Sequence, residues 1–173
     1  DWVAEAAEGL IALSGGPQGD VAQALLKGRA EEAERRLARW LSVFGDRYYL
    51  ELIRTGREPE AELIESSVEL AIRHGVPVVA TNDVRFIARA DFEAHEARVC
   101  IHEGRTLDDP RRPRPYSEEQ YLRSPQEMAE LFADLPEALE NSVEIARRCN
   151  IELTLGKNFL PAFPVPAGMT IDG

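Results

Sequence analysis

Short apolar runs alternate along the chain with longer stretches in which apolar residues recur every three or four positions. The short runs cover residues 10–13, 48–53 and 76–80 and predict strands that are buried in a sheet. Residues 30–44 carry one apolar stripe and predict a helix, and a further helix is expected to begin near Pro59. Alternating strands and helices need crossover connections, so the strands are expected to be mostly parallel and covered by helices. The predicted fold class is therefore α/β.

Three other segments carry helix-start signals, in which a capping residue is followed three positions later by Glu or Gln. They begin at Asp20, Ser124 and Asp134, and the last two include a proline that suits the first turn of a helix. The helix after Asp20 is expected to end near Gly28. A final short strand is predicted at residues 151–155.

The helical patterns also predict which side chains face the core. The buried positions are expected to be Ile64, Val68, Ala71 and Ile72 after Pro59, and Leu139, Val143 and Ala146 after Asp134. The two cysteines, Cys100 and Cys149, lie in apolar-patterned segments without a second cysteine or histidine at metal-ligand spacing. We expect them to be reduced core thiols in a cytosolic protein.

The chain has 173 residues and carries 20 Lys and Arg against 31 Asp and Glu, which gives a net charge of −11. This acidic balance argues against a domain whose main task is to bind nucleic acid, because phosphate binding depends on Lys and Arg. Any direct DNA contact would therefore be local. No apolar run reaches the length of a membrane span, and no segment has the pattern of a secretory signal. We expect a cytoplasmic protein without membrane contact.

The sequence changes character near its end, where FLPAFPVPAG brings three prolines into six positions. Proline removes backbone donors and favours an extended path over a packed helix. Residues 1–156 are therefore predicted to form a folded domain, and residues 157–173 an extended exit segment.

The candidate chemistry lies where the predicted strands end, because parallel α/β folds form their sites beyond the carboxyl ends of the strands. Asp83 directly follows the run at 76–80, and Arg85 stands two positions later. Arg85 has no lone pair for a metal and is expected to form an ion pair with Asp83. The alternative is that Asp83 only caps a turn while Arg85 is solvated. Glu51 alternates with leucines on its strand and is expected to point to the polar side of the sheet.

The remaining polar residues that could take part in binding or catalysis give weaker signals. Three histidines are too scattered to form an evident metal cluster, namely His74, His95 and His102. His74 is expected at a helix C-terminus, and the other two are expected to be half-buried on one helix face. A proline-stiffened loop contains Arg111, Arg112 and Arg114, which would suit a phosphate or an acidic partner. The alternative is that these arginines pair with nearby carboxylates.

Long strings of the sequence are similar to a known family. They are GLIALSG, GDRYYLELIRTGR, GVPVVATNDVRFI, DFEAHEARVCIHEGRTLDDPRRPRPYSEEQYLRS, ELFADLPEALENSVEIARRCN and NFLPAFPVP. These strings resemble the alpha subunits of bacterial DNA polymerase III, in their N-terminal PHP (polymerase and histidinol phosphatase) domain. The resemblance is specific, because the strings follow in order and include surface loops that no fold requirement dictates.

The resemblance implies that the chain forms the later part of a distorted (β/α)7 barrel and continues toward the polymerase palm. PHP proteins usually open with a His-x-His motif, and none precedes Leu10 here, so the chain is expected to begin inside the barrel. The palm carboxylates that bind magnesium for nucleotide transfer are expected beyond residue 173. The parent protein is thus expected to be a DNA-directed DNA polymerase, whereas this fragment is expected to have no catalytic residue and no cofactor of its own.

The resemblance also bears on the metal site. Family members that hold a metal cluster have Asp-x-His where this chain has Asp83 and Arg85, and they tend to have Cys and His at the positions of Gly16 and Thr55. These three replacements remove the soft and imidazole donors that a transition-metal site needs. The resemblance therefore implies a vestigial site of Asp83, Arg85, Gly16, Thr55 and Glu51 without bound metal.

The function implied by the resemblance is that of a scaffold in DNA replication. It would stabilise the polymerase and dock the 3′–5′ proofreading exonuclease subunit, with the rest of the alpha subunit as its other partner and DNA reached through the parent polymerase. One alternative is an active metal-dependent PHP phosphoesterase, either an exonuclease or a pyrophosphatase, in which metal ions activate water. Another is the error-prone paralogue of the same polymerase.

Overall fold

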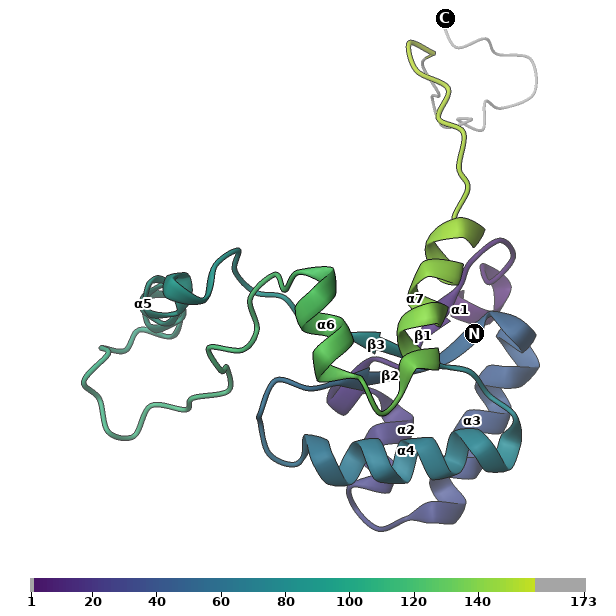
Figure 1. The fold of residues 1–173 in the computed structure, drawn as a ribbon, viewed down its shortest axis with the longest axis horizontal. Helices are drawn as coiled ribbons and strands as arrows, with labels where there is room; N and C mark the ends of the chain where they lie inside the picture. The colour runs from purple at the N-terminus through teal and green to yellow at the C-terminus, as the bar shows by residue number, and fades with distance from the viewer. Residues whose placement is uncertain (1, 158–173) are drawn as a thin grey trace, which may run out of the picture.

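A parallel sheet forms the centre of the molecule. The structure is a computed structural model that describes residues 2–157. Its strands are β1 (Ala12–Leu13), β2 (Tyr48–Ile53) and β3 (Val78–Thr81), in the order β1-β2-β3 (Figure 1). β2 pairs in parallel with both neighbours. The predicted α/β class is confirmed, and the arrangement is consistent with part of a β/α barrel.

Helices precede and follow each strand. They are α1 (Trp2–Glu5), α2 (Asp20–Leu25), α3 (Ala30–Phe44), α4 (Glu60–His74), α5 (Phe92–Glu103), α6 (Pro125–Leu131) and α7 (Pro136–Arg148), with short 3-10 turns at Gly16–Gln18, Gly45–Arg47 and Arg89–Asp91. α4 packs on β2, and α7 packs on β3. α5 stands apart from the other helices (Figure 1). Within residues 2–157, no helix is both long enough and apolar enough to cross a lipid bilayer.

One hydrophobic core joins the sheet to its helices. Because side chains alternate along a strand, Leu50 and Leu52 face this core while Glu51 faces the other side of the sheet. Leu37 of α3 and Phe132, just after α6, are fully buried in the core. One face of β2 therefore packs in the hydrophobic core, and the other face carries the polar side chain of Glu51.

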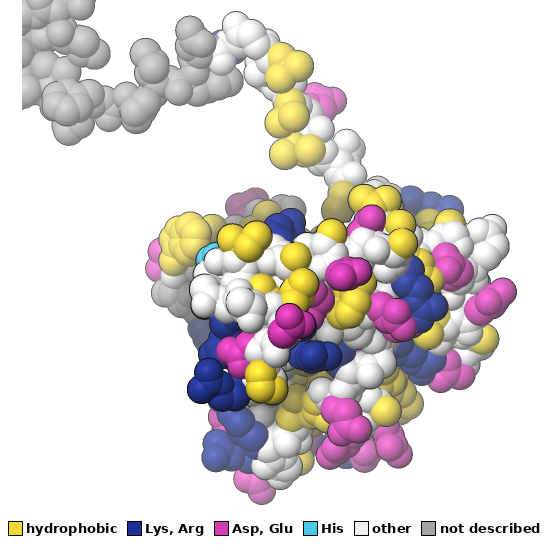
Figure 2. Space-filling model, turned by 90° about the vertical axis from the view of Figure 1, so that its left-hand side faces the viewer, with side chains coloured by type: hydrophobic (Ala, Val, Ile, Leu, Met, Phe, Trp, Pro, Cys, Tyr) yellow, Lys and Arg dark blue, Asp and Glu magenta, His cyan; other side chains and the backbone are white. Residues whose placement is uncertain are grey.

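The strand predicted at residues 151–155 is wrong, because this segment is irregular. Its apolar side chains are exposed: Ile151 by 81%, Leu153 by 72% and Leu155 by 86%. Figure 2 shows apolar side chains on the segment that leads from the body of the molecule to the residues drawn in grey. A strand needs a neighbouring edge for its backbone, and no strand within residues 2–157 pairs with this segment. The predicted exit segment at 157–173 lies almost wholly outside the described residues.

Several predicted core positions need correction. On α4, Ile72 is 78% exposed, whereas Ile64 and Ala71 are buried as predicted. α7 buries Ala138 near its start, and its C-terminal half is mostly exposed, including Val143 and Ala146. α7 contacts the sheet at two points: Asn141 Nδ2 donates to the Val78 carbonyl at 2.8 Å, and Arg148 at its C-terminal end donates to the Tyr49 hydroxyl at 2.8 Å. On both helices the apolar stripe thus extends beyond the part of the helix that other residues cover.

The two cysteines also differ in their burial. Cys100 is buried as predicted, but Cys149 is exposed. Cys149 follows the last turn of α7, where Ala146, Arg147 and Arg148 are exposed as well. The expected pair of core thiols is therefore wrong for Cys149.

Two of the three predicted helix caps do not form. Asp20 is the first residue of α2, and its carboxylate accepts from Trp40 Nε1 at 2.9 Å. Asp134 pairs with Arg54 instead of capping α7, whose N-cap is Leu135. In both cases a tertiary partner takes the carboxylate from the local backbone. The helix after Asp20 ends at Leu25, followed by a turn to Gly28.

The capping box of α6 is confirmed. The Ser124 hydroxyl accepts from the Glu127 backbone, and the Glu127 carboxylate accepts from the Ser124 backbone at 2.8 Å. Tyr121 also donates its hydroxyl to Glu127 at 2.5 Å. These donors favour the ionised carboxylate, with Tyr121 the strongest cause, and lower the pKa of Glu127 from 4.5 to about 2.

We expect this carboxylate to make stability depend on pH. A lowered folded-state pKa gives stabilisation that is present above pH 4.5 and is lost as the pH falls from 4.5 toward 2. Urea unfolding of the chain and of Glu127→Gln should therefore differ most above pH 5 and converge toward pH 2. A difference between the two proteins that stays constant over this range would contradict the assignment.

Phe132 should be among the most sensitive core positions. The substitution Phe132→Ala is expected to lower the free energy of unfolding by about 3 to 5 kcal/mol, because it leaves a cavity in a closed core. Leu122→Ala, at a side chain that is 58% exposed, is the control and should change it by less than about 0.5 kcal/mol. Urea denaturation measures both, and equal effects would contradict the described core.

Candidate functional site

Three strand ends meet around one cavity of about 630 Å³ on the polar side of the sheet. Its walls include Gly15, Glu51, Thr81, Asp83 and Arg85. Asp83 has a φ of 43°, a left-handed conformation that Asp tolerates better than most residues. This conformation belongs to the sharp turn that the chain makes directly after β3.

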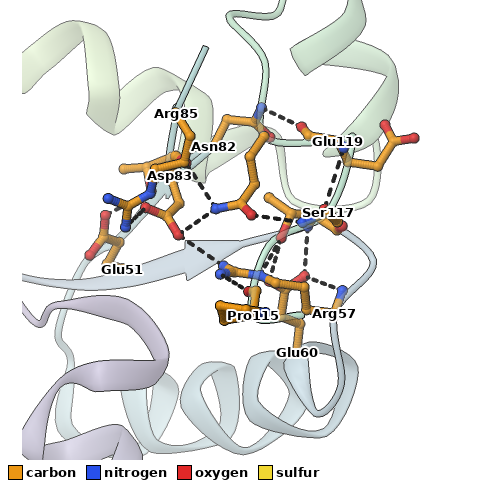
Figure 3. A network of polar contacts seen from close by, with 12 residues as sticks. Glu51, Arg57, Glu60, Asn82, Asp83, Arg85, Pro115, Ser117 and Glu119 are labelled. Carbon is orange, nitrogen blue, oxygen red and sulfur yellow. Dashed lines mark hydrogen bonds and ion pairs between the residues drawn. The ribbon is translucent and has the colours of Figure 1, made fainter. Parts of the chain in front are cut away.

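The carboxylate of Asp83 is held by cationic and amide donors. Arg85 Nη2 lies 2.7 Å from Asp83 Oδ1, so the predicted ion pair is confirmed. Arg57 Nη2 lies 3.0 Å from Oδ2, and Gln120 Nε2 donates to the same oxygen at 2.8 Å (Figure 3). The side chain of Asp83 is only 22% exposed. Both of its oxygens therefore have protein partners.

Arg57 connects this carboxylate to the end of β2 and the start of α4. Its Nε donates to Glu60 Oε1 at 3.0 Å and to Thr55 Oγ1 at 2.8 Å. Glu60 is buried and also accepts from the Thr55 hydroxyl and the Thr55 backbone, each at 2.6 Å. Figure 3 shows Arg57 between Asp83 and Glu60. Thr55 is thus fully buried in the support of Arg57 and does not line the cavity.

Arg57 and Glu60 were missed by the sequence reasoning. Their three-residue spacing at the start of a helix favours an ion pair, which is a weak signal because such pairs are common on exposed helices. What distinguishes this pair is that Glu60 is buried. The burial of Glu60 depends on the return of the chain near Asp83. The local sequence pattern around Glu60 does not reveal this return.

Glu51 lines the cavity together with Arg57, and Gly16 lies next to the lining residues Gly15 and Pro17. Thr81 Oγ1 donates to Glu51 Oε1 at 2.7 Å, and the Glu51 backbone N–H donates to Ser14 Oγ at 2.9 Å. Gly16 has a φ of 51°, and a Cβ built on it would collide with Ile53 Cδ1. A larger side chain at Gly16 would therefore be strained in the backbone and would require Ile53 to move.

A returning segment closes the site from the side of α5. Ser117 Oγ donates to the Thr55 carbonyl at 2.6 Å. Asn82 Nδ2 donates to the Glu119 carbonyl at 2.9 Å and to the Tyr121 carbonyl at 2.8 Å. Residues far apart in sequence are thereby fixed around Asp83.

The donor set does not fit a metal cluster. No group of three or more His, Cys, Asp or Glu side chains in residues 2–157 is placed to hold a metal ion. Asp83 is shared by two guanidinium groups, which repel a further cation and offer it no lone pair. Glu51 remains as a carboxylate hydrogen-bonded to Thr81.

The histidines are not brought to the cavity. His74 ends α4 as predicted, and His102 is exposed on α5. His95 is buried, with its ring edge-on to Tyr116 at a centroid distance of 4.7 Å. Burial, followed by the nearby charge of Arg98, lowers the pKa of His95. The expectation that His95 and His102 are both half-buried is wrong, because only one of them faces a neighbour.

The arginine loop does not form one common surface. Arg112 is buried against Glu96, so it is not accessible to a phosphate or a partner. Arg111 is exposed and contacts Asp109 at 3.5 Å. Arg114 is exposed as well. The alternative that these arginines pair with nearby carboxylates is confirmed for Arg111 and Arg112, and the phosphate contact is wrong for Arg112.

Known proteins are similar to this chain over nearly its whole length. The PHP domain family model matches residues 1–55. DNA polymerase III subunit alpha of Pseudomonas aeruginosa is 64% identical over 172 residues, which cover 99% of this chain and 15% of that protein. The subunits of the same name from Escherichia coli K12 and Vibrio cholerae are 59% and 56% identical, over 95% and 99% of this chain and 14% and 15% of theirs. The expected resemblance is confirmed, and the chain spans about 15% of the length of these relatives.

The ion pairs of Asp83 give a testable contribution to stability. We expect Asp83→Asn to lower the free energy of unfolding by about 1 to 3 kcal/mol, because it strands two partly buried guanidinium groups. The control is Asp46→Asn, whose 86% exposed carboxylate pairs with Arg148 and should contribute less than about 1 kcal/mol. Urea denaturation at neutral pH compares the two, and an unchanged midpoint for Asp83→Asn would count against the network.

Proposed function

We propose that this chain is part of the PHP domain of a bacterial replicative DNA polymerase alpha subunit, acting in DNA replication in the cytoplasm. Identity of 56% to 64% with three DNA polymerase III alpha subunits, over 95% or more of the chain, supports this proposal. Nucleotide transfer, its magnesium ions and the main DNA contacts would belong to the rest of the parent protein. The chain itself would supply no catalytic group.

We further propose that the cavity beside Asp83 is a vestigial metal site. The observation that carries this proposal is the position of Arg57 and Arg85, each within 3.0 Å of one Asp83 oxygen. A guanidinium group neutralises a carboxylate as a metal ion does, but it has no open coordination position and cannot lower the pKa of a bound water. The guanidinium groups of Arg57 and Arg85 thus hold the loops after β2 and β3 together, as metal ions would otherwise do.

The role that follows from such a site is structural. A PHP domain without hydrolytic metals would stabilise the polymerase and dock a separate 3′–5′ proofreading exonuclease subunit, as the resemblance implies. The buried Glu60 and Thr55 support this role, because they hold Arg57 in place from the protein side. The competing function is an active PHP phosphoesterase, favoured only by the presence of Glu51 and Asp83 around the same cavity.

Elemental analysis of the complete polymerase subunit that contains this chain separates the two functions. We expect less than about 0.1 zinc, manganese or iron per molecule after dialysis, since no three metal-ligating side chains converge in the described residues. We also expect a one-to-one complex with the exonuclease subunit, measured by analytical ultracentrifugation. Stoichiometric metal that is lost in Asp83→Ala, together with phosphoesterase activity lost in the same variant, would establish the competing function.

A further inference from the structure

A second and larger cavity runs between α4 and the connection from α6 to α7. Its volume is about 1220 Å³. The apolar side chains that line it are Ala61, Ile64, Val68 and Ile72 from α4, and Leu131 and Leu135 from the opposite wall. Ile72 is 78% exposed here, and Val68 is half-buried. We call this feature the α4 groove.

The wall of the α4 groove opposite α4 is fixed by contacts within the chain. Arg54 makes a two-pronged pair with Asp134, at 2.6 and 2.7 Å, and donates to the Leu131 carbonyl at 2.6 Å. Its guanidinium also lies over the ring of Phe132, 4.7 Å from the centroid. The first of these contacts lowers the pKa of Asp134, because the hydrogen bond favours the ionised carboxylate. This wall of the groove is therefore held in place by contacts within residues 2–157.

The rim of the α4 groove carries uncompensated negative charge. Its three arginines are matched, because Arg54 pairs with Asp134, Arg57 with Glu60 and Asp83, and Arg123 with Glu119. Three exposed carboxylates of the α4 wall have no ion pair within residues 2–157, namely Glu58, Glu62 and Glu65. An apolar floor beside a row of unpaired carboxylates has the chemistry of a site for a basic amphipathic segment.

We propose that the α4 groove binds an amphipathic helix of a partner protein that has Lys and Arg beside its apolar stripe. From Ala61 to Ile72 the α4 wall is about 16 Å long at 1.5 Å per residue, which matches three turns of a helix. The apolar stripe of such a helix would cover Val68, Ile72 and Leu135, and its cations would meet Glu62 and Glu65. A nucleic acid does not fit, because the rim would repel its phosphates. A second copy of the chain would bring two acidic rims together.

The probe is a fluorescein-labelled synthetic peptide of about 14 residues, with Leu on one helical face and Lys elsewhere. It is titrated against the complete polymerase subunit, and binding is followed by fluorescence anisotropy at near-physiological salt. We expect saturable binding that is at least about tenfold weaker for Glu62→Lys/Glu65→Lys, through lost attraction and added repulsion. A peptide with Glu in place of Lys should not bind.

Matched variants separate the groove from the general negative charge of the chain. Glu137→Lys/Glu140→Lys changes the net charge equally on an exposed part of α7 and should weaken binding by less than about twofold. Ile72→Ser should weaken binding, and Ile101→Ser, at an 81% exposed side chain on α5, should not. Thermal melting of each variant reports whether it is folded.

Three results would overturn the proposal. They are the absence of saturable binding, equal weakening by the groove and control variants, and a change in self-association caused by Glu62→Lys/Glu65→Lys. The last result, seen by analytical ultracentrifugation, would assign the groove to a second copy. Metal content and the one-to-one complex with the exonuclease subunit are measured on the unsubstituted subunit without the peptide, so the proposed function is tested separately.

Discussion

The structure around the candidate site depends on the position of one guanidinium group, that of Arg57. It lies 3.0 Å from Asp83 after β3, and it donates to the buried Glu60 of α4 and to Thr55 after β2. A buried carboxylate such as Glu60 is tolerated only when it is paired and hydrogen-bonded. Arg57 therefore pairs with two carboxylates, one in the first turn of α4 and one after β3, and in doing so it links the end of β2 to the end of β3.

This arrangement explains why the carboxylate of Asp83 has no oxygen free of protein partners in the polar cavity. Water activation by a metal needs an ion with an open coordination position, and the oxygens of Asp83 are already held by Arg57 and Arg85. At Gly16 the backbone has a φ of 51°, which glycine adopts without strain, and the end of the Ile53 side chain lies close to it.

The sequence predicted those parts of this arrangement that are local. The limits of α3 and β2, the capping box of Ser124 and the pair of Asp83 with Arg85 depend on residues within a few positions of each other. The pair of Arg57 with Asp83 and that of Arg54 with Asp134 join residues 26 and 80 positions apart, so only the folded chain reveals them. The predictions of a buried Ile72 and of a strand at residues 151–155 are wrong for the same reason. In both places the apolar residues form the pattern of a buried element, but no described neighbour covers them.

The position of Arg57 also links the two cavities, because its side chain lines both the cavity of Asp83 and the α4 groove. It stands just before the first turn of α4, which carries its partner Glu60. A shift of that turn would therefore move the support of Asp83 and one wall of the groove together. The polar network therefore has a structural role, since it holds the start of the helix whose outer face forms the groove. A helix that is packed on one side, as α4 is, has few alternative positions. The polar network and the groove therefore keep their geometry together.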